Sequence, residues 1–177
     1  MPDHDRFLST AARGPLDAER ARLIETFARE TATTLRVVRA FPPDALESRP
    51  HPRSMTAREL MWLFTMELTV CVRALMGAEK LFDGKAAPDT LDAIATAFDK
   101  ARGELLALLR SCDDDDLAGT VSFPVAPGKL ADWPRTDFLW LMLHDQIHHR
   151  GQLSVYLRMA GGRLPSIYGP TADEPWS

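Results

Sequence analysis

The stretch His144-Asp145-Gln146-Ile147-His148-His149 decides how the rest of the chain is interpreted. It holds three of the five histidines of a 177-residue chain and lies in a proline-free run from residue 135 to residue 160. On a helix, residues four apart lie one above the other, so His144 and His148 point the same way. Such a pair can bind one divalent ion through two ring nitrogens. The spacing therefore predicts half of a metal site on one long helix.

The face that carries this pair is partly apolar. Leu141, Val155 and Met159 share it with the two histidines, since each residue turns a helix by about 100°. We therefore expect His144 and His148 to face the interior of the protein. The competing interpretation is that a histidine on an apolar face is a hydrogen-bonded core residue.

Four helical stretches are predicted along the chain, at about residues 16–40, 56–76, 89–111 and 132–160. Their ends carry recognisable signals. Pro42-Pro43 ends the first helix, because proline lacks an amide donor. Thr56-Ala57-Arg58-Glu59 has the spacing of a capping box at the start of the second, and Gly161-Gly162 ends the fourth. Few strand signals accompany these helices, so the sequence predicts an all-α, four-helix bundle, a fold that builds metal sites from facing helices.

The segment between the third and fourth helices is predicted to be a loop, from Asp113 to Lys129. Within it, Thr120 to Phe123 is expected to form a short strand or an extended segment. Pro134 is expected in the first turn of the fourth helix, where proline is tolerated.

Glu67 is the candidate for a third metal ligand. It is the only charged residue between Leu60 and Val72, and a helix that is apolar nearly all round is buried. A buried carboxylate must be neutralised, paired or bound to a cation. A metal held with His144 and His148 would meet this need. An ion pair with an arginine such as Arg150 is the alternative.

Composition excludes several classes of protein. The formal net charge is −4 and the basic residues are scattered, which argues against a nucleic-acid partner. The two cysteines form no CxxC pair, so a disulfide framework or a cysteine-ligated zinc site is not expected. The longest apolar run, residues 138–143, is too short to cross a membrane, and the N-terminus lacks the features of a signal peptide. We expect one cytoplasmic domain over residues 1–177, with residues 1–14 flexible and the tail 163–177 packed on the bundle.

The C-terminal third of the chain resembles a known family. The segments His144–Gln152, Ser154–Arg158, Gly161–Pro165 and Ile167–Pro170 look like the C-terminal signature of the DinB family, the DinB/YfiT-like metalloenzymes. The resemblance is specific over about residues 138–176 and weaker over residues 57–62. It implies an up-down-down-up four-helix bundle that forms a homodimer. It also implies a divalent metal, zinc or nickel, held by one histidine on the second helix and two on the last.

The ligand residues of the family carry over only in part. His144 and His148 match the pair on the last helix, whereas the histidine of the second helix would fall at Leu63, which cannot ligate. Glu67 lies one turn later and could substitute as an oxygen ligand. In many members the histidine pair is shifted by one position. Asp145 and His149, turned by about 100° from the first pair, are therefore the alternative pair.

Four neighbouring residues are expected to support the site. His149, Arg150 and Gln152 are expected beside the ligands or as anchors of nearby loops. Tyr168 could line a substrate pocket.

The resemblance also implies a reaction. Some relatives are thiol-dependent transferases, such as bacillithiol S-transferases and mycothiol-dependent maleylpyruvate isomerase. We therefore expect a metal-dependent enzyme that uses a low-molecular-weight thiol on a small electrophile, or a hydrolytic variant of it. A metal- or ligand-binding stress protein without catalysis is one alternative. A relative that has lost its metal is the other, and the leucine at position 63 favours it.

Overall fold

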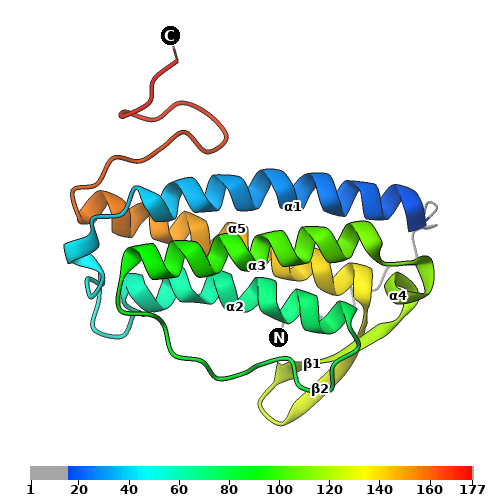
Figure 1. Cartoon of the computed structure of the whole chain (residues 1–177). Coiled ribbons are helices and arrows are strands. Elements are labelled where there is room, and N and C mark those ends of the chain that lie inside the picture. Colours follow the sequence, from blue (N-terminus) through cyan, green and yellow to red (C-terminus); the bar gives the residue numbers. More distant parts are fainter. Residues whose placement is uncertain (1–15, 177) are drawn as a thin grey trace, which may run out of the picture.

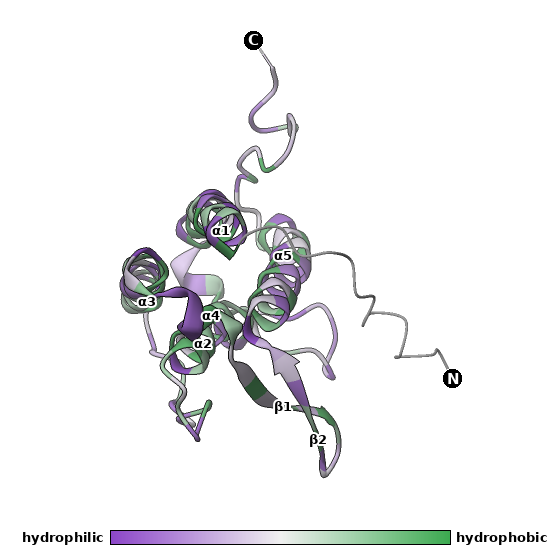
Figure 2. Ribbon diagram, turned by 90° about the vertical axis from the view of Figure 1, so that its right-hand side faces the viewer, coloured by the Kyte–Doolittle hydropathy of each residue, from purple (hydrophilic) through white to green (hydrophobic). Residues whose placement is uncertain are grey.

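Four long helices lie side by side in the computed structural model, which describes residues 16–176. They are α1 (Leu16–Arg39), α2 (Ala57–Leu75), α3 (Leu91–Ser111) and α5 (Arg135–Met159). Helix α1 packs against α3 and α5, and α2 packs against the same two helices. Viewed end on, the four helices surround one core (Figure 2). This arrangement brings the middle of α2 next to the middle of α5, which matters for the site.

Helix α2 begins where the sequence predicted. The side chain of Thr56 accepts a hydrogen bond from the backbone N–H of Glu59, and the Glu59 carboxylate accepts one from the backbone N–H of Thr56. The expected capping box is therefore confirmed. The apolar residues that follow, Leu60, Phe64 and Leu68, are buried within the single chain.

The connection from α2 to α3 runs back along the whole bundle, so that both helices run in the same direction (Figure 1). The earlier connection, from α1 to α2, contains a short helix, η2 (Pro43–Ala45). Side chains of α2 hold the long connection along its length. Arg73 donates a hydrogen bond to the carbonyl oxygen of Leu81 (3.1 Å), and the Trp62 indole donates to that of Lys85 (2.9 Å).

The segment before α5 differs from the prediction. A short helix, α4 (Asp114–Ala118), begins at a capping box between Asp113 and Asp116. Two antiparallel strands follow, β1 (Thr120–Ala126) and β2 (Lys129–Pro134), joined through Gly128 at φ +69°. The predicted extended segment is confirmed, but the loop and the helical start at residue 132 are wrong. Pro134 closes the second strand, and the chain is mostly helical rather than purely all-α.

The tail after α5 contacts the bundle through polar groups. Arg36 of α1 forms an ion pair with Glu174 (2.8 Å), and Arg158 of α5 forms one with Asp173 (2.7 Å). The expected flexibility of residues 1–14 lies outside the described residues. Among residues 16–176, no helix has the length and apolar character needed to cross a membrane.

Candidate metal centre

Glu67 and His149 face each other across the contact between α2 and α5. The Nδ1 atom of His149 lies 2.9 Å from Oε1 of Glu67, which is a hydrogen-bond distance. Glu67 comes from the middle of α2, where its neighbours Phe64, Leu68 and Cys71 are buried. The helix is apolar on this side, so it places a carboxylate in the core and leaves His149 as its hydrogen-bond partner.

Asp145 completes a three-residue cluster. It lies one turn before His149, and its Oδ1 atom is 3.7 Å from Nδ1 of that histidine. One ligand atom from each of Glu67, Asp145 and His149 lies within 4.8 Å of the others. The side chains of Glu67, His149 and Asp145 are 5%, 14% and 44% exposed. The cluster is therefore closed on the α2 side and open to solvent on the Asp145 side.

The electrostatics of the cluster follow from burial and from the Glu67–His149 hydrogen bond. Burial raises the pKa of the Glu67 carboxyl to about 7, although the hydrogen bond with His149 and the charge of that histidine act to lower it. The hydrogen bond with Glu67 raises the pKa of His149 above its ordinary value, against the opposing effect of burial. Both groups therefore hold a proton more readily in the folded protein than as free side chains, and each would ligate a cation when deprotonated.

A buried oxygen of Glu67 bears on whether a metal would fit the cluster. Within residues 16–176, the buried Oε2 atom of Glu67 has no hydrogen-bond partner. A buried acceptor left unsatisfied costs about 1–3 kcal/mol, and a divalent cation would satisfy it. Two carboxylates and an imidazole are ordinary ligands of divalent ions. The residues present therefore fit a divalent metal.

Gln146 is a neighbour of the cluster that sequence reasoning missed. It is almost completely buried, and its side chain acts to lower the pKa of Glu67. In the described part of the chain, its buried Oε1 atom has no hydrogen-bond partner. The sequence offered one sign of its role, because Gln146 lies on α5 between Leu143 and Leu153, which are both buried. A buried polar side chain there is expected to have a hydrogen-bonding or binding role.

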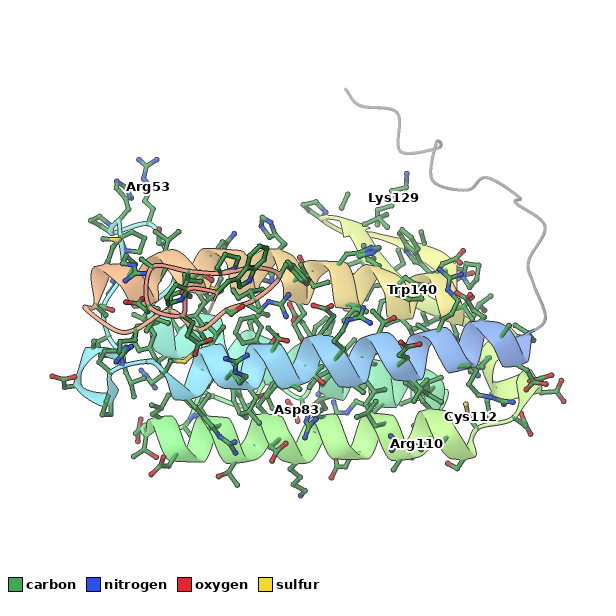
Figure 3. The ribbon with its side chains drawn as sticks, turned by 90° about the horizontal axis from the view of Figure 1, so that it is seen from above. Arg53, Asp83, Arg110, Cys112, Lys129 and Trp140 are labelled. Atoms are coloured by element: carbon green, nitrogen blue, oxygen red, sulfur yellow. The ribbon has the colours of Figure 1, made fainter. Side chains whose placement is uncertain are left out.

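His144 and His148 do not join this cluster, and both are exposed. The expectation that they face the interior is therefore wrong. The Nε2 atom of His148 lies 2.8 Å from the side-chain nitrogen of Gln152, and the His144 ring stacks on Trp140. Figure 3 shows Trp140 at the edge of α5 that faces α1, where its indole donates to Glu19. We call His144 and His148 the outer pair, and Asp145 and His149 the inner pair.

Arg150 has a different partner from the one considered for it. Its guanidinium is buried and forms an ion pair with Glu30 of α1 (2.7 Å), so the alternative of a Glu67–Arg150 ion pair is wrong. The Tyr168 hydroxyl donates to the same Glu30 carboxylate (2.6 Å) and accepts from Arg150 (2.6 Å). Arg150 and Tyr168 therefore attach the tail to α1 and α5.

Known proteins are similar to this chain in sequence and in fold. Residues 26–153 match the sequence model of the DinB superfamily. A segment of 44 residues is 46% identical to the uncharacterized protein YrdA of Bacillus subtilis (strain 168), and it spans 25% of this chain and 26% of that protein. The chain therefore spans only about a quarter of that relative's length.

Two solved structures share the fold over most of the chain. A DinB-like protein from Bacillus cereus ATCC 10987 superposes with a TM-score of 0.67 at 23% identity, over 82% of this chain and 95% of that one. A DinB-like protein from Bacillus subtilis, YjoA, gives a TM-score of 0.66 at 21% identity, over 82% of this chain and 97% of that one. At such identities the structural likeness concerns the fold alone.

Proposed function

The chain belongs to the DinB superfamily, and from that premise we propose that it is a divalent-metal-dependent enzyme acting on a small molecule. The observation that carries the proposal is the cluster of Glu67, Asp145 and His149, whose ligand atoms lie within 4.8 Å of one another. These three residues would hold the ion, in place of the predicted set of His144, His148 and Glu67. The up-down-down-up bundle of the family is part of the same proposal.

The three residues have different roles in this proposal. Glu67 is anchored in the core, so it would fix the ion to α2. His149 would ligate through Nδ1 only when that atom carries no proton, so metal binding would compete with the Glu67–His149 hydrogen bond. Asp145, the most exposed of the three, lies on the side from which a substrate would approach. A bound ion would act as a Lewis acid and would lower the pKa of a thiol or a water molecule.

The finer form of the proposal is a thiol-dependent S-transferase. This form rests on the family resemblance. In such a reaction a low-molecular-weight thiol attacks a small electrophile as its thiolate. Hydrolysis of a small electrophile is the other reaction that the same site could support. A homodimer also belongs to this proposal, and light scattering would then give about twice the 19.7 kDa of one chain.

A binding protein without catalysis is the second candidate, and one observation favours it. In the described part of the chain, one cavity lies beside Trp62 and Arg73 and another beside Arg36 and Arg163. Neither is lined by Glu67, Asp145 or His149. Neither cavity therefore provides a substrate pocket next to the cluster. Binding of an ion alone needs no such pocket.

Metal content is the decisive measurement. Protein purified without a histidine tag or chelator, and incubated with zinc, nickel or manganese, should carry about one equivalent of metal per chain. Glu67→Ala should abolish this occupancy, whereas His144→Ala, a change in the exposed outer pair, should leave it intact. Less than about a tenth of an equivalent in the wild-type protein would overturn the proposal, because a three-ligand site binds tightly. For a metal-loaded protein, a screen of thiols against electrophiles would then separate an S-transferase, a hydrolase and a binding protein.

A further inference from the structure

Oxygen predominates among the donor atoms of the cluster. Two of the three ligating groups, Glu67 and Asp145, present carboxylate oxygens, and only His149 presents a nitrogen. A further polar side chain that acts on Glu67, that of Gln146, has a buried oxygen without a partner in the described residues. No sulfur is among the three donors, and Cys71, one turn after Glu67, lies outside the cluster in the core. The surroundings of an ion held there would therefore be rich in oxygen.

Donor type sets which divalent ions a site favours. Carboxylate, carbonyl and water oxygens suit magnesium, calcium and manganese, whereas imidazole suits zinc and nickel and thiolate suits soft ions. Every site of this kind binds zinc more tightly than manganese, because affinity follows the Irving–Williams order. What the donor set changes is the size of that preference. An oxygen-rich set makes it smaller than a histidine-rich set does.

We propose that the oxygen-rich Glu67–Asp145–His149 site holds an oxygen-preferring divalent ion such as manganese, and that it prefers zinc over manganese less strongly than a histidine-rich site does. This inference rests on the proposed metal site. It replaces the expectation of zinc or nickel, which came from a set of three histidines that this chain does not have. A carboxylate, a phosphate or water would complete the coordination of such an ion.

The position of Asp145 makes the inference testable by exchange of one donor atom. Its side chain is 44% exposed, so substitutions there leave the core intact. Asp145→His converts the donors to one oxygen and two nitrogens. The matched control is His144→Asp, the opposite exchange at the preceding residue of the outer pair. A second variant, Asp145→Cys, introduces sulfur in a side chain no larger than aspartate.

The experiment measures the dissociation constants of manganese and zinc for each protein, by calorimetry or by competition with a chromogenic chelator. We expect the ratio of the manganese constant to the zinc constant to rise by about tenfold or more in Asp145→His. It should rise further in Asp145→Cys and stay unchanged in His144→Asp. Circular dichroism checks that each variant is folded. If Asp145→His does not fold, the ratio measured for Asp145→Cys tests the inference.

Two results would count against the inference, and they differ from failure of the metal site itself. An unchanged ratio in both Asp145 variants, with one ion bound per chain, would show that these donors do not set the preference. A fall of this ratio in His144→Asp, with no change in the Asp145 variants, would place the ion at the outer pair. If the wild-type protein binds neither ion, the proposed function fails and this inference fails with it.

Discussion

The outer pair and the inner pair are two copies of one spacing on the same helix. His144 and His148 are four residues apart, and so are Asp145 and His149, one residue further along α5. The step of one residue turns the pair by about 100°. That turn carries it from the exposed face, where His148 bonds to Gln152, to the contact with α2, where His149 bonds to Glu67. The pair with two nitrogens faces water, and the pair with one nitrogen faces a buried carboxylate.

The difference shows what a helical spacing leaves undecided. Spacing places two donors on one face, but a useful metal site needs a third donor from another element and shelter from water. An exposed charge interacts through a high effective dielectric constant, so its attraction for an ion is weak. Glu67 is 5% exposed, and one of its oxygens has no hydrogen-bond partner among residues 16–176, so an ion beside it gains much more. The partner across the helix contact, rather than the number of histidines, marks the site.

The largest expected effect is the loss of metal affinity when one ligand is removed. His149→Ala should weaken binding by about 100-fold or more, since loss of a residue that only supports a ligand already costs about 10–100-fold. His148→Ala, the same chemical change at the preceding residue, should alter affinity by less than about threefold. Isothermal titration calorimetry measures both. Equal losses in the two variants would break the distinction between the pairs.

Much of this arrangement could be predicted from the sequence, because the signals were local. The capping box at Thr56 and Glu59, the long helices and the metal-prone motif on the last helix all depend on neighbouring residues. Glu67 was recognisable as a candidate because it is the one charge in an apolar stretch. Only the first strand of the hairpin at residues 120–134 was predicted. Part of β2 has the sequence features of a helix start, and the prediction assigned it to the fourth helix.

The choice between the two pairs could not be predicted from the residues of α5 alone. Apolar residues lie on several sides of this helix, and Val155 and Met159, which suggested an interior face for the outer pair, are exposed. Which face is buried depends on how α1 and α2 pack against α5. Arg150 shows the same difficulty, because its partner Glu30 is 120 residues away on α1. Spacing offered Asp145 and His149 as a second pair on another face, and the resemblance to shifted family members kept them as the alternative.

The dependence of stability on pH should also separate the pairs, with an effect on the order of 2 kcal/mol. In the metal-free protein the pKa of Glu67 is raised from 4.5 to about 7, and that of His149 is raised as well. The folded state therefore binds more protons than the unfolded state, so the free energy of unfolding should fall as the pH rises from about 5 to 8. Urea denaturation at several pH values measures this fall.

Two matched variants test whether Glu67 causes this fall in the free energy of unfolding. Glu67→Gln keeps the shape of the side chain and removes its titration, so most of the slope should disappear. His148→Ala should leave the slope unchanged, because that ring is exposed and bonded to Gln152. A metal-free wild-type protein whose stability rises over the same pH range would contradict the coupling of Glu67 and His149.

The smallest effect distinguishes two glutamines that lie beside the two pairs. Gln146 is buried next to Glu67, and Gln152 is exposed next to His148. Because an amide beside a carboxylate ligand orients it, Gln146→Leu should weaken metal binding by about tenfold. Gln152→Leu, the same change in size and polarity, should leave affinity unchanged. Calorimetric titration of both variants, with circular dichroism to check folding, tests this difference. A loss confined to Gln152→Leu would mean that the ion lies on the exposed face of α5, and that the inner pair serves only to neutralise Glu67.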